Sequence, residues 1–181
     1  MHRVSAMALI GCLLMVSALT GAAPAGAASV TLGSRLSTGG LGPLKIGMSV
    51  SAAGDVVGSG FDPTQLSGES PADNACFWGG ISPKRYGVSV LGTGFRIAVV
   101  FVSKRSVATT RDIRVGDSVA KLFRAYGSGL HAKPNFYSPS EIHYELAVGN
   151  RKLLFYVSRA GKVSGMQAGR KPEIDYVEGC A

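Results

Sequence analysis

The sequence predicts an α+β fold in which two tandem helix-plus-antiparallel-sheet repeats form one two-layer domain. The first observation is an ungapped internal match between residues 44–58 (LKIGMSVSAAGDVVG) and residues 113–127 (IRVGDSVAKLFRAYG), which indicates a tandem duplication. The second is that short apolar segments separated by glycine-containing turns follow each copy, as in antiparallel meanders. Together these features predict helices packed on one face of a sheet.

Residues 1–27 have the pattern of a secretory signal peptide. Arg3 precedes an apolar run, and the small residues that follow end in an A-x-A motif, which predicts cleavage after Ala27. The apolar run is too short for a transmembrane span, and cleavage after Ala27 removes it. We therefore expect no transmembrane segment in the mature chain. An alternative is that the residues ending at Cys12 are a bacterial lipobox, in which case Cys12 would be lipidated and become the mature N-terminus.

The rest of the chain divides into a linker and two repeats. Residues 28–40 are rich in Gly, Ser and Thr, and we expect a flexible N-terminal segment there, with at most a short strand at residues 29–32. Residues 41–108 are the predicted first repeat and residues 109–181 the second. About 150 residues suffice for one core shared by both repeats, and we expect a monomer.

The mature chain is predicted to be basic. Removing residues 1–27 leaves 18 of the 19 Lys and Arg residues and all 11 Asp and Glu residues, a formal charge of +7. A cationic surface favours an acidic protein or an anionic component of the cell envelope as neighbour. Solubility alone is the other explanation, because the basic residues form scattered pairs. Nucleic acid is not expected as a partner, since no binding motif is present.

Two cysteines remain after signal removal, Cys76 and Cys180. An even number of cysteines in an exported protein is most simply a disulfide. This bond would tie the end of the chain to the first repeat.

Each copy of the internal match carries the signals of a short helix. Ser49 and Ser118 can cap the first free N–H groups, and Gly58 and Gly127 can take the left-handed conformation after the last turn. The shared motif consists of Gly47, Met48, Ser49 and Gly58 in the first copy and Gly116, Asp117, Ser118 and Gly127 in the second.

The apolar positions of both helices follow the spacing of a buried stripe. They are Val50, Ala53, Gly54 and Val57 in the first helix and Val119, Leu122, Phe123 and Tyr126 in the second. The second set has larger side chains, so the second helix should anchor the core and the first repeat should be the looser half.

A polar segment with two prolines, residues 59–75, is predicted to be a long surface loop. Strands are then expected at hairpin spacing in both repeats. Their ranges are 76–78, 87–91 and 96–103 in the first repeat and 141–148, 152–158 and 162–168 in the second. In residues 97–102 both alternate sets are apolar, which favours a central, covered strand over an exposed binding patch.

Alternation along the strands of the second repeat separates two faces. Ile142, Tyr144, Leu146, Leu153, Phe155 and Val157 form an almost uniformly apolar set, which should face the helices. The opposite set mixes two large side chains with two polar ones, the composition of an interface. The candidate partner-binding residues are therefore Tyr156, Leu154, His143 and Glu145.

The sequence gives no sign of catalysis, of a cofactor or of a metal site. His131 and His143 do not lie at metal-ligand spacing with another His, Cys or carboxylate. A G-x-S-x-G motif is absent, and the glycine-rich segments lack the lysine of a phosphate loop. We therefore expect no enzyme. Several aromatic residues are possible interface anchors if exposed: Phe77, Trp78, Tyr86, Phe136, Tyr137 and Tyr144.

The Gly47-Met48-Ser49 start and Gly58 resemble the repeat start of the β-lactamase-inhibitor-protein-like superfamily, which includes the small lipoprotein of the bacterial outer-membrane barrel-assembly machinery. The resemblance covers nearly all of residues 41–181. The whole mature chain looks like the secreted actinobacterial proteins of this type. In the second copy Gly116-Asp117-Ser118 replaces Gly-Met-Ser. The resemblance implies a concave, protein-binding sheet and no enzymatic activity. The inhibitor's cysteine spacing is absent here, and no residue matches its inhibitory hairpin.

These features predict a secreted or cell-wall-associated, non-catalytic module that binds a protein through one face of its antiparallel sheet. The alternative is a structural or assembly factor of the cell envelope, held at the wall by charge.

Overall fold

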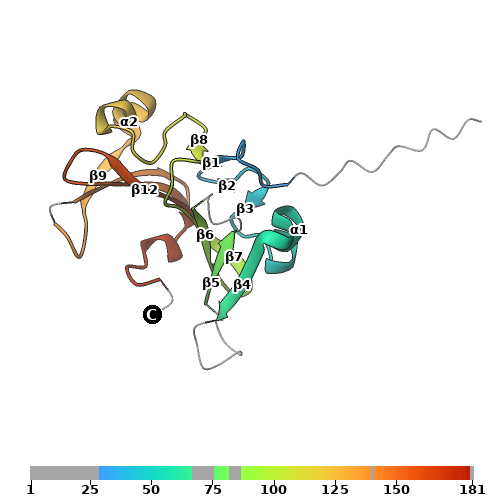
Figure 1. The fold of residues 1–181 in the computed structure, drawn as a ribbon. Helices are drawn as coiled ribbons and strands as arrows, with labels where there is room; N and C mark the ends of the chain where they lie inside the picture. The colour runs from blue at the N-terminus through green and yellow to red at the C-terminus, as the bar shows by residue number, and fades with distance from the viewer. Residues whose placement is uncertain (1–28, 67–75, 82–86, 140, 180–181) are drawn as a thin grey trace, which may run out of the picture.

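A computed structural model describes residues 29–66, 76–81, 87–139 and 141–179. Within these residues two α-helices, three 3-10 turns and two sheets are present (Figure 1). The helical elements are α1 (Val50–Val57), η1 (Gly58–Gly60), α2 (Val119–Tyr126), η3 (Gly127–Gly129) and η4 (Glu173–Asp175). The strands are β1 (Arg35–Ser37), β2 (Gly40–Leu41), β3 (Leu44–Lys45), β4 (Phe61–Leu66), β5 (Phe77–Ile81), β6 (Val88–Thr93), β7 (Arg96–Val102), β8 (Ala108–Thr109), β9 (His131–Pro134), β10 (Ile142–Val148), β11 (Arg151–Val157) and β12 (Val163–Arg170). The fold is therefore α+β, with the sheets dominant.

The main sheet has eight strands in the order β4-β5-β6-β7-β12-β11-β10-β9. Every neighbouring pair is antiparallel. The order consists of two four-stranded meanders joined at their last strands, where Val100 of β7 lies opposite Ala168 of β12. We call β4–β7 with α1 the first half and β9–β12 with α2 the second half. Each half contributes one edge strand and one central strand.

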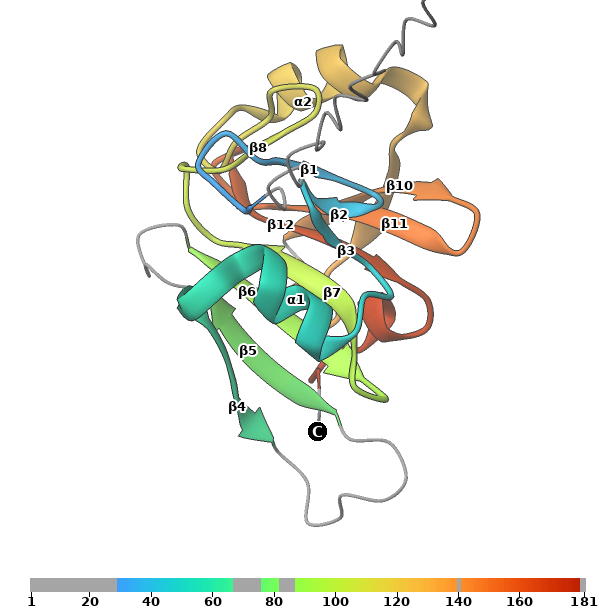
Figure 2. The same cartoon turned by 90° about the vertical axis from the view of Figure 1, so that its right-hand side faces the viewer.

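One face of the main sheet is covered by α1, α2 and the small sheet β3-β2-β1-β8 (Figure 2). Leu36 of β1 and Leu41 of β2 are fully buried in the core between the two layers, and β2 contacts both central strands. The predicted flexibility of the N-terminal segment is wrong for residues 35–40. Their order comes from parallel pairing of β1 with the distant β8, which local sequence does not reveal.

The starts of the two helices are fixed to the sheet in the same way. Gly47 donates its backbone N–H to the carbonyl of Ile97 at 2.7 Å, and Gly116 donates to the carbonyl of Val163 at 2.7 Å. Both glycines have positive φ, 89° and 91°, a conformation that glycine adopts without a steric cost. Each glycine thus lets the chain turn from the sheet into the helix.

The predicted N-caps are confirmed. The Ser49 hydroxyl accepts the N–H of Ala52 at 3.2 Å, and the Ser118 hydroxyl accepts the N–H of Lys121 at 3.3 Å. The C-terminal glycines differ from our expectation in one respect. Gly58 and Gly127 have positive φ, 75° and 59°, but their ψ angles of −157° and −142° are extended rather than left-handed helical. This combination of φ and ψ is open almost only to glycine. It lets the chain pass from each helix directly into a 3-10 turn.

The two helices differ, as predicted, in the size of the side chains that they bury. In α1 only Ala53 is buried, whereas α2 buries Leu122 and Tyr126. Phe123 was expected in the core, but it is 42% exposed. Its ring lies on the rim of the helix and meets Tyr144 edge-on at 5.1 Å.

The six predicted strands are present as β5, β6, β7, β10, β11 and β12, with ends that differ from the prediction by at most three residues. The edge strands were missed: β4 lies in the segment predicted to be a loop, and β9 was not predicted. Each carries a proline, Pro63 or Pro134, and proline is tolerated at sheet edges because no N–H is needed on the outer side. Residues 29–32 do not form the short strand that we considered.

Both central strands contain a bulge at corresponding places. Leu91 lies opposite Val99 and Gly92 opposite Ile97, so Ala98 is the extra residue in β7. Tyr156 lies opposite Gly165 and Val157 opposite Val163, which makes Ser164 the extra residue in β12. A bulge exchanges the faces of the residues beyond it. Ile97 therefore faces the helices, whereas Val99 faces the other way, so the strict alternation expected for residues 97–102 is wrong at the bulge. The prediction that β7 is central and covered is confirmed.

The other face of the main sheet, which we call the outer face, is partly covered by the C-terminal segment, residues 171–179 (red in Figure 1). Ile174 completes a small apolar cluster there; its other buried members are Leu91, Ala98, Val99 and Leu154. Glu173 accepts hydrogen bonds from Arg170 at 2.7 Å and from the Thr93 hydroxyl at 2.6 Å. These contacts fix the segment on β12 and on the end of β6.

Candidate binding pocket on the outer face

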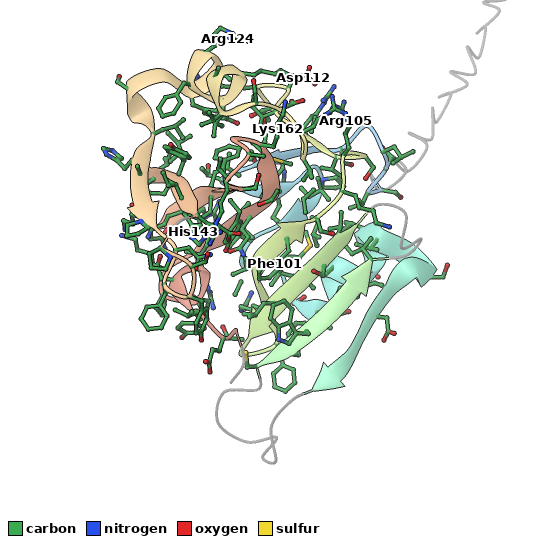
Figure 3. All side chains as sticks on the ribbon, turned by 60° about the vertical axis from the view of Figure 1, so that its left-hand side comes forward. Phe101, Arg105, Asp112, Arg124, His143 and Lys162 are labelled. Atoms are coloured by element: carbon green, nitrogen blue, oxygen red, sulfur yellow. The ribbon has the colours of Figure 1, made fainter. Side chains whose placement is uncertain are left out.

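A pocket of about 270 Å³, the outer pocket, lies between the second half of the sheet and the C-terminal segment. Its floor comes from β10 and β11, one wall from β9 and the loop after it, and the other wall from the C-terminal segment. The lining residues are Lys133, Pro134, Asn135, Phe136, Tyr137, His143, Glu145, Leu154, Tyr156, Ile174, Asp175, Tyr176 and Val177. In Figure 3, His143 lies beside the C-terminal segment, whereas Arg124 and Arg105 lie at the α2 end of the molecule.

All four candidate partner-binding residues line this pocket: Tyr156, Leu154, His143 and Glu145. The prediction of the faces is confirmed, because Phe155 packs against Tyr126 of α2 at 5.2 Å on the opposite side of the sheet. Leu154 corrects our expectation of exposure. It is buried, since Ile174 of the C-terminal segment covers it. It is therefore part of the pocket floor and not an open contact.

His143 and Tyr156 lie opposite each other on neighbouring strands. Their rings meet edge-on with centroids 4.1 Å apart. Burial lowers the pKa of His143, against the opposing effect of the Glu141 charge, so the imidazole is neutral at pH 7. Burial raises the pKa of Tyr156 to about 12. Nε2 of His143 is buried and has no hydrogen-bond partner, which leaves one polar atom of the floor unsatisfied.

An ion-pair network supports the floor. Lys152 has a side chain only 3% exposed and contacts Glu145 at 3.1 Å and Asp175 at 2.6 Å. Glu145 also contacts Lys133 at 3.0 Å. Burial alone would lower the pKa of Lys152, but the hydrogen bonds to Asp175 and Glu145 outweigh it and raise that pKa. For Glu145, the bonds from both lysines outweigh burial and lower the pKa. Because leaving one buried charge unpaired is costly, the two pairs of Lys152 hold β10, β11 and the C-terminal segment together.

Three exposed aromatic residues form the aromatic rim of the pocket: Phe136, Tyr137 and Tyr176. Phe136 is 76% exposed and Tyr137 is 61% exposed, and their rings meet edge-on at 5.2 Å. Tyr137 donates its hydroxyl hydrogen to Glu178, which joins the loop to the C-terminal segment. Among the aromatic residues named from the sequence, Phe77 is buried in the core and Tyr86 lies outside the described residues.

Sequence reasoning missed Tyr176, Asp175 and Lys152 as members of this site. The alternation of polar and large side chains pointed to β10 and β11, but no local signal shows that residues 174–177 fold back over them. The acidic character of residues 173–178 beside a lysine-bearing strand was the one available hint.

The repeat-motif residues lie away from the pocket, at the starts and ends of the two helices. Asp117 is buried and pairs with Lys121 at 2.8 Å and with Arg105 at 3.0 Å. Burial would raise the pKa of Asp117, but these cations and the N–H of Arg114 lower it. Met48 occupies the corresponding position in the first half, where its carbonyl accepts the N–H of Ile97 at 2.8 Å, as that of Asp117 accepts from Val163 at 2.9 Å.

The predicted disulfide can be followed only at one end. Cys76 is disulfide-bonded, but Cys180 lies outside the described residues, as do Cys12 and residues 1–27. The neighbouring Gly179 lies so close to the indole of Trp78 that a Cβ there would overlap it. The pairing of Cys76 with Cys180 therefore stays a prediction that agrees with this placement.

Within the part of the chain that the structure describes, no three His, Cys, Asp or Glu side chains are grouped to hold a metal ion. No helix in that part is long and apolar enough to cross a membrane.

Comparisons with known proteins give little beyond this geometry. No family model and no curated protein matches the chain. A crystal structure of an extracellular protein containing an SCP domain, from Bacillus anthracis str. Ames, is similar with a TM-score of 0.48 and 9% sequence identity. The match covers 70% of this chain and 44% of that one, so this chain spans less than half of the structure it resembles.

Proposed function

We propose that this chain is an exported, non-catalytic protein-binding module, and that it holds its partner at the outer pocket. The observation that carries the proposal is the pocket of about 270 Å³ that contains all four residues selected from the sequence and is bordered by the aromatic rim. Exposed aromatic side chains around a hollow with a few polar groups are typical of protein-binding hot spots. A monomer rarely leaves such a patch uncovered without a use for it.

We further propose that the module is a tandem duplication of the kind found in the β-lactamase-inhibitor-protein-like superfamily. Four matched features support this: the strand order of the two halves, the hydrogen bonds of Gly47 and Gly116, the serine caps, and the bulges at Ala98 and Ser164. A single accident would reproduce one of these features, not all four. Export is supported by the pattern of residues 1–27 and by the disulfide at Cys76, which is typical of oxidising compartments.

Site-directed photo-crosslinking tests the binding site. A photoreactive phenylalanine analogue replaces Phe136 on the aromatic rim in one protein and Phe123 on the helix side in a matched control, since both side chains are exposed. In the culture medium of the native organism, the variant at residue 136 should capture a defined protein that the variant at residue 123 does not.

The captured protein then serves for quantitative binding. Tyr137→Ala should weaken its affinity about tenfold or more, the range of an interface anchor, whereas Arg124→Ala on α2 should leave it unchanged. Equal capture from both crosslinker positions, or an affinity insensitive to Tyr137, contradicts the proposal.

A second candidate function is an envelope factor held by charge, and one cluster favours it. Four cations surround Asp112 and Asp117 near α2: Arg35, Arg105, Arg114 and Lys121. Exposed charges of this kind are screened at physiological ionic strength, where the Debye length is about 8 Å. If this function is the true one, the protein should leave cell walls during a wash at moderate salt, while a specific protein complex should survive it.

A further inference from the structure

The surroundings of the outer pocket are acidic although the chain as a whole is basic. The lining contains Lys133, Glu145 and Asp175. Side chains bonded to the lining add Lys152, which contacts both carboxylates, Glu141, which accepts from Asn135 at 3.2 Å, and Glu178, which accepts from Tyr137. These are four carboxylates and two ammonium groups. The pocket together with the side chains bonded to its lining therefore carries a formal charge of about −2 on a chain whose total is +8, and this charge attracts a cation.

The lining also offers aromatic faces. Phe136, Tyr137, Tyr156 and Tyr176 surround the same hollow. Aromatic rings attract a cation placed over their faces, more strongly once water is excluded. Rings together with nearby carboxylates discriminate a cation from a neutral group of the same shape.

The floor supplies an unsatisfied acceptor. Nε2 of the neutral His143 is buried and unpartnered, and in the tautomer protonated at Nδ1 it accepts a hydrogen bond. The groups that face this imidazole are the ring of Tyr156, the cross-strand Lys133 and the charge of Glu141. The atom has almost no accessible surface in the free protein, so it adds to the polarity of the floor and is not itself an open contact.

One of the pocket's own cations is only loosely held. Lys133 is 56% exposed and contacts Glu145 at 3.0 Å. Exposed ion pairs contribute little, so an incoming cation can replace Lys133 at this carboxylate. Lys152 is not displaced in this way, because it is buried between Glu145 and Asp175.

From these features we infer that the outer pocket takes the guanidinium group of an arginine side chain presented by the protein partner, which displaces Lys133 from Glu145. A guanidinium is planar and stacks on aromatic rings, and its N–H donors pair with a carboxylate such as that of Glu145. The inference rests on the proposed function, since it names the partner group that the same pocket recognises.

The experiment titrates N-acetyl-arginine amide into the full mature protein and follows the ring signals of His143 and Tyr156 by NMR. N-acetyl-citrulline amide is the neutral isostere, and N-acetyl-lysine amide is the second cation. Arginine should give saturable shifts at both rings, citrulline none, and lysine at least threefold weaker binding. Equal binding of citrulline or of lysine overturns the assignment to a guanidinium.

Three variants locate the effect. Lys133→Ala should tighten arginine binding by up to about fivefold, because the competing ammonium is gone. Phe136→Ala should weaken it about twofold to fivefold, and this side chain is so exposed that the fold is not at risk. Asp55→Asn removes an exposed carboxylate on α1 and should change nothing. No change with Lys133→Ala and Phe136→Ala, or an equal change with Asp55→Asn, overturns the inference.

The two proposals fail separately. A partner captured through residue 136 that binds the protein while arginine amide does not would leave the proposed function standing and remove the arginine assignment. Arginine bound in the pocket without any partner captured there would support the arginine assignment and remove the proposed function.

Discussion

The two halves of the main sheet have the same strand order but use their outer faces differently. In the first half, the rings of Trp78 and Phe101 lie 4.9 Å apart with a tilt of 39°, and Gly179 of the C-terminal segment lies against Trp78. In the second half the corresponding surface is hollow and carries the ion-pair network and the aromatic rim. We call the half that fixes the end of the chain the closed half and the half that carries the outer pocket the open half. The closed half also carries a hollow farther from the C-terminal segment, lined by Gly80, Ser89 and Lys104.

The two helices also differ in how much they contribute to the core. In α2, Leu122 and Tyr126 enter the core, while α1 contributes only the methyl group of Ala53. The half that carries the pocket is therefore the better anchored half on its inner face. This fits a binding site, because a pocket needs a floor that does not move when its ligand arrives.

The largest effect is expected from the link between the C-terminal segment and the closed half. If Cys76 pairs with Cys180, reduction opens a loop of about one hundred residues and lowers the free energy of unfolding by about 4 to 5 kcal/mol, or less if the native bond is strained. Trp78 is the one tryptophan of the chain, so its fluorescence should shift to the red as Gly179 leaves the indole.

Thiol labelling provides the check for this bond. Intact protein should react with a thiol reagent only after reduction. Labelling of both Cys76 and Cys180 in native, unreduced protein excludes the bond between them, and labelling of Cys180 alone shows that Cys76 has another partner.

The second prediction compares the two helices directly. Leu122→Ala removes a fully buried side chain and should lower the free energy of unfolding by about 2 to 5 kcal/mol. Ala53→Gly in α1 should cost only about 1 kcal/mol. Denaturant titration of both variants measures the difference. Similar losses in the two variants would show that the halves contribute equally, contrary to the comparison above.

Local sequence was enough for the elements whose signals are local. The serine caps, the positive φ of Gly58 and Gly127 and the six inner strands were predicted from spacing and alternation, because these depend on neighbours along the chain. The faces of β10 and β11 were also correct, since no bulge interrupts the pairing between these strands.

The rest depended on contacts between distant residues. Leu36 stands among glycines and serines and reads as part of a linker, but pairing of its strand with β8 buries it. The edge strands contain prolines, which argue against a strand until the position at the edge is known. Burial of Leu154 depends on Ile174, twenty residues later. The composition of the pocket was therefore predicted in part, and its closure by the C-terminal segment was not.

The third prediction concerns pH and the open half. The pKa of His143 is lower in the folded protein than its ordinary value, so both states hold a neutral imidazole above pH of about 6.5. As the pH falls below that value the unfolded chain takes the proton first, and stability decreases until the folded-state pKa is reached. Glu145 also has a lowered pKa, so its stabilising contribution is lost only at lower pH, below about 4.5.

Denaturation midpoints at pH 7.5, 6 and 5 measure the histidine step. His143→Gln should remove most of the decrease between pH 7.5 and 5, while His131→Gln, at an exposed position of β9, should retain it. A decrease that persists in the His143 variant would assign the step to another group.

The smallest effect is expected at the two turns whose backbone carbonyls accept a hydrogen bond from the first residue of each helix. Phe95 and Gly161 have the same role, since their carbonyls accept the N–H of Val50 and of Val119, both at 3.0 Å. Both have positive φ, 57° for Phe95 and 66° for Gly161. A non-glycine residue in this conformation costs roughly 1 to 2 kcal/mol, and Phe95 gains little from packing because it is 58% exposed.

Phe95→Gly should therefore stabilise the protein by up to about 1 kcal/mol, the relief of strain being partly offset by the greater freedom of glycine in the unfolded chain. Gly161→Ala should destabilise it by about 1 kcal/mol for the same reason in reverse. Denaturant titration of the two variants is the measurement. If Phe95→Gly instead lowers stability, the phenylalanine ring contributes packing that its exposure does not suggest, and the two turns are not equivalent in energy. A stabilised Phe95→Gly protein would show that the first half retains a strained, exposed aromatic residue where the second half has relieved the strain with glycine.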